Sequence, residues 1–140
     1  MPHRSYTDAY MNTSTRTIEG IPEITAAIRD AGMIPGLSSH YHEVISIVEK
    51  QAYDIPVIIQ PLNVLGFQSN VEVNTLMREI KRTRVQIINI KPLAAGRILP
   101  EVGLDFCFRN IKDHDFVCCG FSCIHDADYD CQFVEILLKR

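Results

Sequence analysis

The 140-residue chain contains no tryptophan, no long apolar run and no block of charges of one sign. Its apolar stretches, such as Val57-Ile58-Ile59, are far shorter than the roughly 18 residues that a membrane-spanning helix needs. The N-terminal residues lack the apolar run of a secretory signal. The 14 Lys and Arg residues against 17 Asp and Glu give a net charge of −3. We therefore expect a cytoplasmic protein with no membrane partner and no nucleic-acid partner.

Several catalytic and nucleotide-binding motifs are also missing. The chain has no P-loop, no HExxH pattern and no nucleophile elbow. The turn after the first predicted strand, in Gly36-Leu37-Ser38-Ser39-His40, lacks the glycine spacing of an open dinucleotide-binding sheet. These absences exclude the enzyme classes that depend on those motifs.

The five cysteines do not form the pattern of a disulfide framework. They are odd in number and crowded into the last third of the chain, so all five are expected to be reduced. Zinc binding is the alternative, because thiolate and imidazole ligands lie close in sequence at Cys118, Cys119, Cys123 and His125. Neighbouring residues on a strand point to opposite faces, however, so no metal is expected.

Apolar residues recur in an alternating order of strand-like and helix-like segments after an irregular N-terminal segment, residues 1–16. Strands are predicted at Met33–Ser38, Ile55–Gln60, Val85–Lys91 and Asp115–Gly120. Helices are predicted at Thr17–Ala31, His40–Gln51, Asn70–Arg82, Pro100–Ile111 and Ile124–Leu138. Gly103 weakens the fourth of these helices by about 1 kcal/mol relative to alanine.

Four consecutive strand-then-helix units predict an α/β fold with a parallel sheet buried under helices. Two architectures fit: a small open doubly wound sheet, or half of a TIM (β/α)8 barrel. Polar residues follow each of the four strands, as expected for a barrel. We therefore interpret residues 1–140 as a single domain, a partial TIM barrel of four βα units with outer helices.

Lys91 and His40 are the candidate catalytic residues, because each stands at the end of a predicted strand. Lys91 could bind an anion, form a Schiff base if burial lowered its pKa, or extend to the rim in a structural role. His40 could act as a general acid, or merely cap and pack.

A phosphate site is predicted after the last two strands. Glycine allows a close approach of backbone amides to a ligand, and a following helix N-terminus adds partial positive charge. The candidates for this site are Gly96, Arg97, Gly120 and Ser122. The alternative is that both glycines only form tight turns. Gln60 and Asn63 could orient a substrate through hydrogen bonds.

Four segments together suggest a family. They are Gly36-Leu37-Ser38-Ser39-His40, Val57-Ile58-Ile59-Gln60-Pro61-Leu62-Asn63, Ile90-Lys91-Pro92-Leu93-Ala94-Ala95-Gly96-Arg97 and Val117-Cys118-Cys119-Gly120-Phe121-Ser122. Their order and spacing over residues 33–135 resemble the C-terminal half of aldo/keto-reductase-like TIM barrels. The stretch from Gly96 to Gly120 is shorter than is usual in that family.

The resemblance implies a nicotinamide cofactor, NAD or NADP, in a groove along Ser38, Gln60, Lys91, Leu93, Gly96 and Ser122. It also implies carbonyl reduction, with the catalytic Asp, Tyr, Lys and His on earlier strands that no residue of this sequence matches. The alternatives are an aldolase-type or isomerase-type barrel that uses Lys91 on a phosphorylated substrate, and a catalytically inactive binding module.

A half barrel would leave two free sheet edges and an uncovered apolar face. We therefore expect a fragment of a longer protein, a homodimer in which two copies complete the barrel, or a degenerate copy of a barrel.

Overall fold

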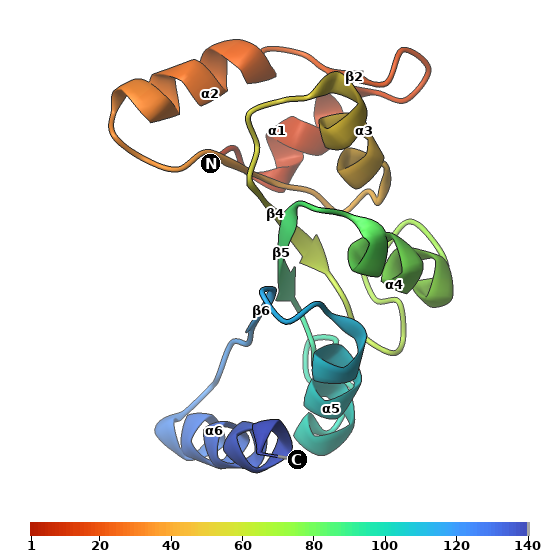
Figure 1. The fold of residues 1–140 in the computed structure, drawn as a ribbon. Coiled ribbons are helices and arrows are strands. Elements are labelled where there is room, and N and C mark those ends of the chain that lie inside the picture. The colour runs from red at the N-terminus through yellow and green to blue at the C-terminus, as the bar shows by residue number, and fades with distance from the viewer. Residues whose placement is uncertain (140) are drawn as a thin grey trace.

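The computed structural model describes residues 1–139, and its central feature is a four-stranded parallel sheet (Figure 1). The strand order is β3, β4, β5, β6, the same as the order in the chain. Their bounds are β3 (Gly36–Ser38), β4 (Val57–Pro61), β5 (Gln86–Ile90) and β6 (Phe116–Cys118). The helices that alternate with them are α3 (Glu43–Gln51), α4 (Val73–Arg82), α5 (Pro100–Asn110) and α6 (Ile124–Leu138). The predicted α/β class and all four strand-helix units are confirmed.

One face of the sheet carries the hydrophobic core. Leu37, Ile58 and Ile87 lie side by side in the strand register, and each is completely buried. In Figure 1, α3, α4 and α5 lie along one side of the sheet, while α2 and α6 lie at opposite ends of the molecule. The helices contribute core residues such as Val44, Ile80 and Cys107. Apolar burial against these three helices is therefore the main contribution to stability.

The opposite face of the sheet is only partly covered. Alternation places Val57, Ile59, Ile88 and Ile90 there, and all four are half-buried. Phe116 on the same face is 58% exposed. Helices α3, α4 and α5 all cover the other face (Figure 1), so the expected outer helices lie on one side of the sheet and this apolar face is left partly open.

The N-terminal residues are structured, which corrects the expectation of an irregular segment over residues 1–16. Helix α1 (Arg4–Ala9) is capped by the His3 side chain, which accepts a hydrogen bond from the Ser5 amide. A short antiparallel pair follows, β1 (Met11–Asn12) with β2 (Thr17–Ile18). The first predicted helix is correspondingly shorter: α2 (Ile21–Asp30) begins after Gly20, whose left-handed φ of 73° cannot continue a helix.

Several predicted ends differ from the structure for local reasons. The first strand begins at Gly36 rather than Met33, because Pro35 has no N–H for the strand ladder. The last strand stops at Cys118 rather than Gly120. Asp115 lies just before it and is not part of the strand, because its backbone amide donates to the Lys112 carbonyl (3.0 Å) in a turn. Its carboxylate accepts hydrogen bonds from the amides of Ile87 (2.8 Å) and Lys112 (3.0 Å).

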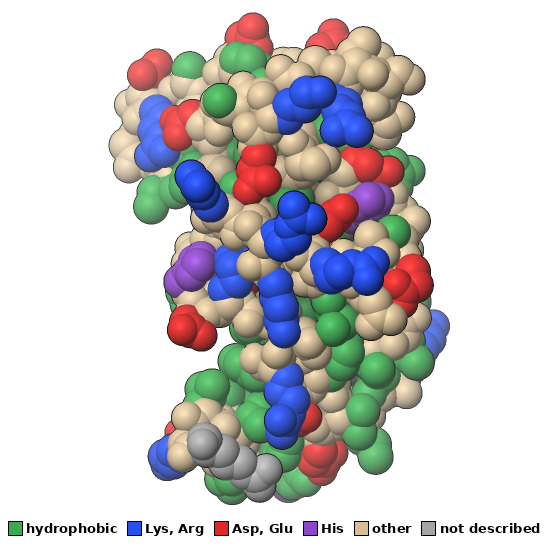
Figure 2. Space-filling model, turned by 45° about the vertical axis from the view of Figure 1, so that its right-hand side comes forward, with side chains coloured by type: hydrophobic (Ala, Val, Ile, Leu, Met, Phe, Trp, Pro, Cys, Tyr) green, Lys and Arg blue, Asp and Glu red, His purple; other side chains and the backbone are tan. Residues whose placement is uncertain are grey.

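The surface carries charges of both signs. Figure 2 shows Lys and Arg side chains running down the middle of one face, with Asp and Glu side chains beside them. Within residues 1–139, no helix combines the length and the apolar character that crossing a bilayer requires.

Candidate functional site

A groove of about 920 Å³ lies at the carboxyl ends of β5 and β6. Its walls are the loops that follow these two strands, together with the first residues of α5 and α6. Five of the residues predicted from the sequence meet there: Lys91, Leu93, Gly96, Gly120 and Ser122. Parallel strands end at the same edge of a sheet, which is why residues distant in sequence come together here.

The loop after β5 has an unusual backbone. Lys91, Ala94, Ala95 and Gly96 all have positive φ, between 48° and 77°. Hydrogen bonds hold the loop in this shape, from the Ala94 amide to the Lys91 carbonyl (3.0 Å) and from the Arg97 amide to the Leu93 carbonyl (3.0 Å). Left-handed backbone is costly for residues other than glycine, so the loop stores strain beside the groove.

The two glycines of the predicted phosphate site have open space beside them. A Cβ added at Gly96 or Gly120 would meet nothing within 4 Å, so packing within the described chain does not require glycine at either position. Gly96 is explained instead by its φ of 77°, which glycine adopts without strain.

Two helix N-termini border the groove. Helix α5 begins after Leu99 and α6 after Cys123, and neither of these N-cap side chains accepts a hydrogen bond from a backbone amide of the first turn. The first amides of a helix have no partner within the helix and carry partial positive charge. The start of α6, with Ser122 and His125, therefore presents uncapped backbone donors to the groove.

The charged side chains of the groove are of both signs. The Lys91 amino group donates a hydrogen bond to Oε1 of Gln68. Burial lowers the pKa of Lys91, and the Arg4 charge lowers it further. Asp126 accepts a 2.6 Å hydrogen bond from the Ser122 hydroxyl, which lowers the pKa of that carboxyl. Lys91 is thus the one lysine or arginine among the residues that line the groove within residues 1–139.

Arg97 is outside the lining of the groove. Its guanidinium carbon lies 4.4 Å from the centre of the Phe67 ring, and Nη1 donates a 2.9 Å hydrogen bond to the Ala94 carbonyl. The predicted phosphate contact is therefore replaced by a cation–π contact that braces the loop.

Gln60 and Asn63 also do not reach the groove. Gln60 lies on the helix-covered face of the sheet beside Asn89 and is fully buried, and neither polar atom of its side chain has a hydrogen-bond partner in the described part of the chain. The Asn63 side chain closes its own loop, because it accepts from the Phe67 amide (2.8 Å) and donates to the Phe67 carbonyl (3.0 Å). Strand alternation explains the place of Gln60, since Ile58 two residues earlier is in the core.

His40 and Ser38 stand at the end of β3, where α1 meets the sheet. The Asp8 carboxylate of α1 accepts hydrogen bonds from the Ser39 hydroxyl (2.6 Å) and the His40 amide (3.3 Å). Desolvation, followed by the charges of Lys91 and Arg4, lowers the pKa of His40 to about 4. At neutral pH His40 is therefore uncharged, a state that suits a proton acceptor better than a general acid.

Asp8 is the residue beside His40 that the sequence did not single out, because no periodic pattern or motif surrounds it. Its role depends on the packing of α1 against the end of β3, which joins segments thirty residues apart in the chain. Only the tertiary structure shows this contact.

The cysteines are all free thiols. Among residues 1–139, no group of three or more His, Cys, Asp and Glu side chains is arranged to hold a metal ion. The zinc alternative at Cys118, Cys119, Cys123 and His125 thus has no support in the geometry.

The geometry of the groove is the basis for assigning a function. Comparison of the chain with protein-family models, with curated proteins and with solved structures finds no match.

Proposed function

We propose that the groove at the ends of β5 and β6 binds a phosphorylated small molecule of the nicotinamide dinucleotide class. The observation that carries this proposal is that five residues predicted for such a site line one groove: Lys91, Leu93, Gly96, Gly120 and Ser122. Its volume of about 920 Å³ is in the range of small-molecule sites.

The phosphate would lie between Lys91 and the start of α6. Lys91 supplies a positive charge on one wall, and the uncapped amides that follow Cys123 supply hydrogen-bond donors on another. Ammonium groups and helix N-termini both favour anions. The carboxyl groups of Asp126 and Asp130 also line the groove, so the phosphate would lie on the Lys91 side of it.

The ring of the ligand would lie against aromatic side chains. Phe67, Phe121 and Tyr129 line the same groove, and the flat faces of such side chains pack against heterocyclic rings. A bound nicotinamide dinucleotide supplies hydride for the reduction of a carbonyl. The residues of this chain would bind and orient it. By the resemblance to aldo/keto reductases, the proton donor would belong to strands that neither this chain nor a second copy of it supplies.

Titration with NADPH and with NADH, followed by the fluorescence of the nicotinamide ring, tests the proposal. We expect saturable binding, and we expect Lys91→Gln to weaken it about tenfold, because a charge-assisted hydrogen bond is lost. Lys50→Gln, an exposed lysine of α3 outside the groove, is the matched control and should bind like the wild type. Equal affinity of both variants would remove Lys91 from the site, and no binding at all would leave the inactive-module alternative.

The lowered pKa of Lys91 favours one alternative chemistry. An unprotonated lysine amine adds to a carbonyl carbon and, with loss of water, forms an imine. Borohydride reduces such an imine to a stable secondary amine. A mass increase on Lys91 after borohydride treatment with a phosphorylated ketone would therefore favour an aldolase-type or isomerase-type site.

We also propose that the four βα units are half of a TIM barrel that a second copy completes. The partly exposed apolar face and the exposed Phe116 on edge strand β6 support this, because isolated sheets rarely leave such surfaces open. Two copies related by a twofold axis would pair β6 of each with β3 of the other.

Light scattering on the purified chain tests whether two copies associate in solution. We expect twice the 15.9 kDa of one chain, and a mass that falls to a single chain when Phe116→Lys places a charge at the edge. Phe121→Lys, an exposed aromatic residue beyond the strand, is the control and should leave the dimer intact. A monomer at all concentrations would contradict the completed barrel.

A further inference from the structure

Helix α6 packs against α5 with one stripe of its surface. The half-buried or buried members of the stripe recur at helical spacing: Asp126, Ala127, Asp130, Phe133, Val134 and Leu137. The rest of the helix is exposed, including Ile124 and Ile136. The most buried position of the stripe is thus occupied by a carboxylic acid, Asp130, at 3% exposure.

Asp130 has no partner that would explain its burial. No hydrogen bond or ion pair within residues 1–139 involves its carboxyl group. Burial raises the pKa of Asp130, and the nearby charges of Asp126 and Glu101 raise it further. Within residues 1–139 the fully buried side-chain atoms without a partner belong to Thr7, Gln60 and Asn89, so the unpaired Asp130 oxygens are accessible from a pocket rather than enclosed in the core. An apolar residue would serve the packing of α6 better.

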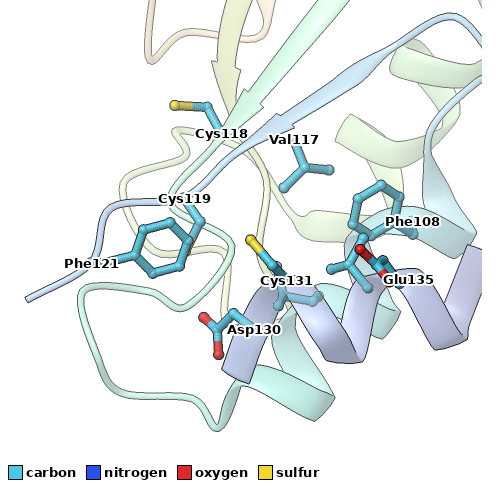
Figure 3. Close-up of a pocket in the computed structure, with 10 residues that line it drawn as sticks. Phe108, Val117, Cys118, Cys119, Phe121, Asp130, Cys131 and Glu135 are labelled. Carbon is cyan, nitrogen blue, oxygen red and sulfur yellow. The ribbon is translucent and has the colours of Figure 1, made fainter. Parts of the chain in front are cut away.

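A pocket of about 550 Å³ opens beside this carboxyl group, between β6, α5 and α6. Figure 3 shows Asp130 on α6, one residue before Cys131, and facing Cys119 and Phe121 of the β6 side. The other walls are mostly apolar: Leu104, Phe108, Val117 and Val134.

Among residues 1–139, the only other ionisable carboxyl group in the lining of the pocket is that of Glu135, and no Lys, Arg or His of this range lines it. With Asp126 and Glu101 also near Asp130, the electrostatic field in this region favours a positive charge. The pocket therefore combines apolar walls with an unpaired carboxylate at one end.

We propose that this pocket binds a compact apolar ammonium compound, with the hydrocarbon part between α5 and α6 and the ammonium group at Asp130. The ammonium group supplies the hydrogen-bond donor and the opposite charge that Asp130 lacks within the described chain. The pocket shares part of its lining with the proposed dinucleotide groove, namely Cys118, Cys119, Phe121 and Asp130. The inference goes beyond that groove because it rests on Asp130 and the apolar walls between α5 and α6, whereas the groove rests on Lys91 and the uncapped amides of α6.

Three probes of one shape test the charge preference in the wild-type protein: cyclohexylmethylammonium, the neutral cyclohexylmethanol and the anionic cyclohexanecarboxylate. Chemical-shift titration of the isotopically labelled protein measures each affinity. We expect the ammonium compound to bind about tenfold more tightly than the alcohol, and the carboxylate to bind weakest. Equal binding of the ammonium compound and the alcohol would overturn the proposal without any variant.

Two variants test whether the preference for the ammonium compound over the alcohol depends on Asp130. Asp130→Asn, which keeps the shape of the side chain, should bind the ammonium compound and the alcohol equally, whereas Asp128→Asn on the exposed face of α6 should keep the tenfold preference. A preference that survives in Asp130→Asn would contradict the assignment. Lys91→Gln should weaken the binding of NADPH without changing the affinity for the ammonium compound. The two measurements therefore distinguish failure of the dinucleotide proposal from failure of the ammonium proposal.

Discussion

Replacement of Asp115 by alanine is expected to lower the free energy of unfolding by about 3 kcal/mol, the cost of breaking a buried ion pair. The Asp115 side chain is 0% exposed and accepts three hydrogen bonds, from the Ile87 amide (2.8 Å), the Lys112 amide (3.0 Å) and the Lys112 amino group (2.8 Å). The alanine variant leaves both amides without this acceptor and the Lys112 charge, only 13% exposed, without its counterion.

Urea unfolding followed by circular dichroism measures this loss. Asp113→Ala is the matched control, because Asp113 is an exposed aspartate two residues away. We expect the control to change stability by less than about 0.5 kcal/mol, as surface substitutions do. Asp115→Asn should be intermediate, since it keeps an acceptor oxygen but not the charge. Similar midpoints for Asp115→Ala and Asp113→Ala would show that the carboxylate does not hold β5 and β6 together.

Gly103→Ala is expected to destabilise the protein by about 2 kcal/mol, the range of overpacking in a filled site. Gly103 lies inside α5, where alanine by itself would favour the helix by about 1 kcal/mol. A Cβ at this position would lie 2.6 Å from the Pro92 carbonyl oxygen and 2.9 Å from the Leu93 Cδ2 atom. The first is backbone, so α5 or the loop after β5 has to move.

The thermal melt of Gly103→Ala decides between these opposing effects. Val102→Ala, at an exposed position next to it on α5, is the control for helix propensity and should melt close to the wild type. Because the displaced loop contains Lys91 and Leu93, we also expect weaker NADPH binding in Gly103→Ala alone. A higher melting temperature would mean that helix propensity outweighs the contact with Pro92.

The sequence predicted the elements of the sheet well because their patterns are local. Apolar runs such as Val57-Ile58-Ile59 and the helical spacing of Leu76 and Ile80 depend only on neighbours in the chain. The predicted ends of the helices and strands were less accurate. The backbone of one residue is enough to shorten an element, as Gly20 does for α2 and Pro35 for β3. The interpretation of Gly103 as a weakness of α5 missed its reason, which is the Pro92 carbonyl of another segment.

The candidate site was predictable where it follows from strand ends and not where it follows from packing. Lys91 and Ser122 meet in the groove because parallel strands end together. The side of the sheet that Gln60 occupies depends on where the helices lie, which periodicity alone does not give. Asp8 and Asp130 could not be identified from the sequence, because the surroundings of each depend on a helix that packs against a distant part of the chain.

The identity of strand order and chain order has a consequence for how the molecule assembles. Each strand of the sheet pairs only with the strand before or after it in the sequence. The sheet can therefore grow from one end, with every new βα unit docking on a surface that is already formed. During synthesis the earlier units need no later segment to complete their ladder, so β6 and α6 are the last of the described elements to dock.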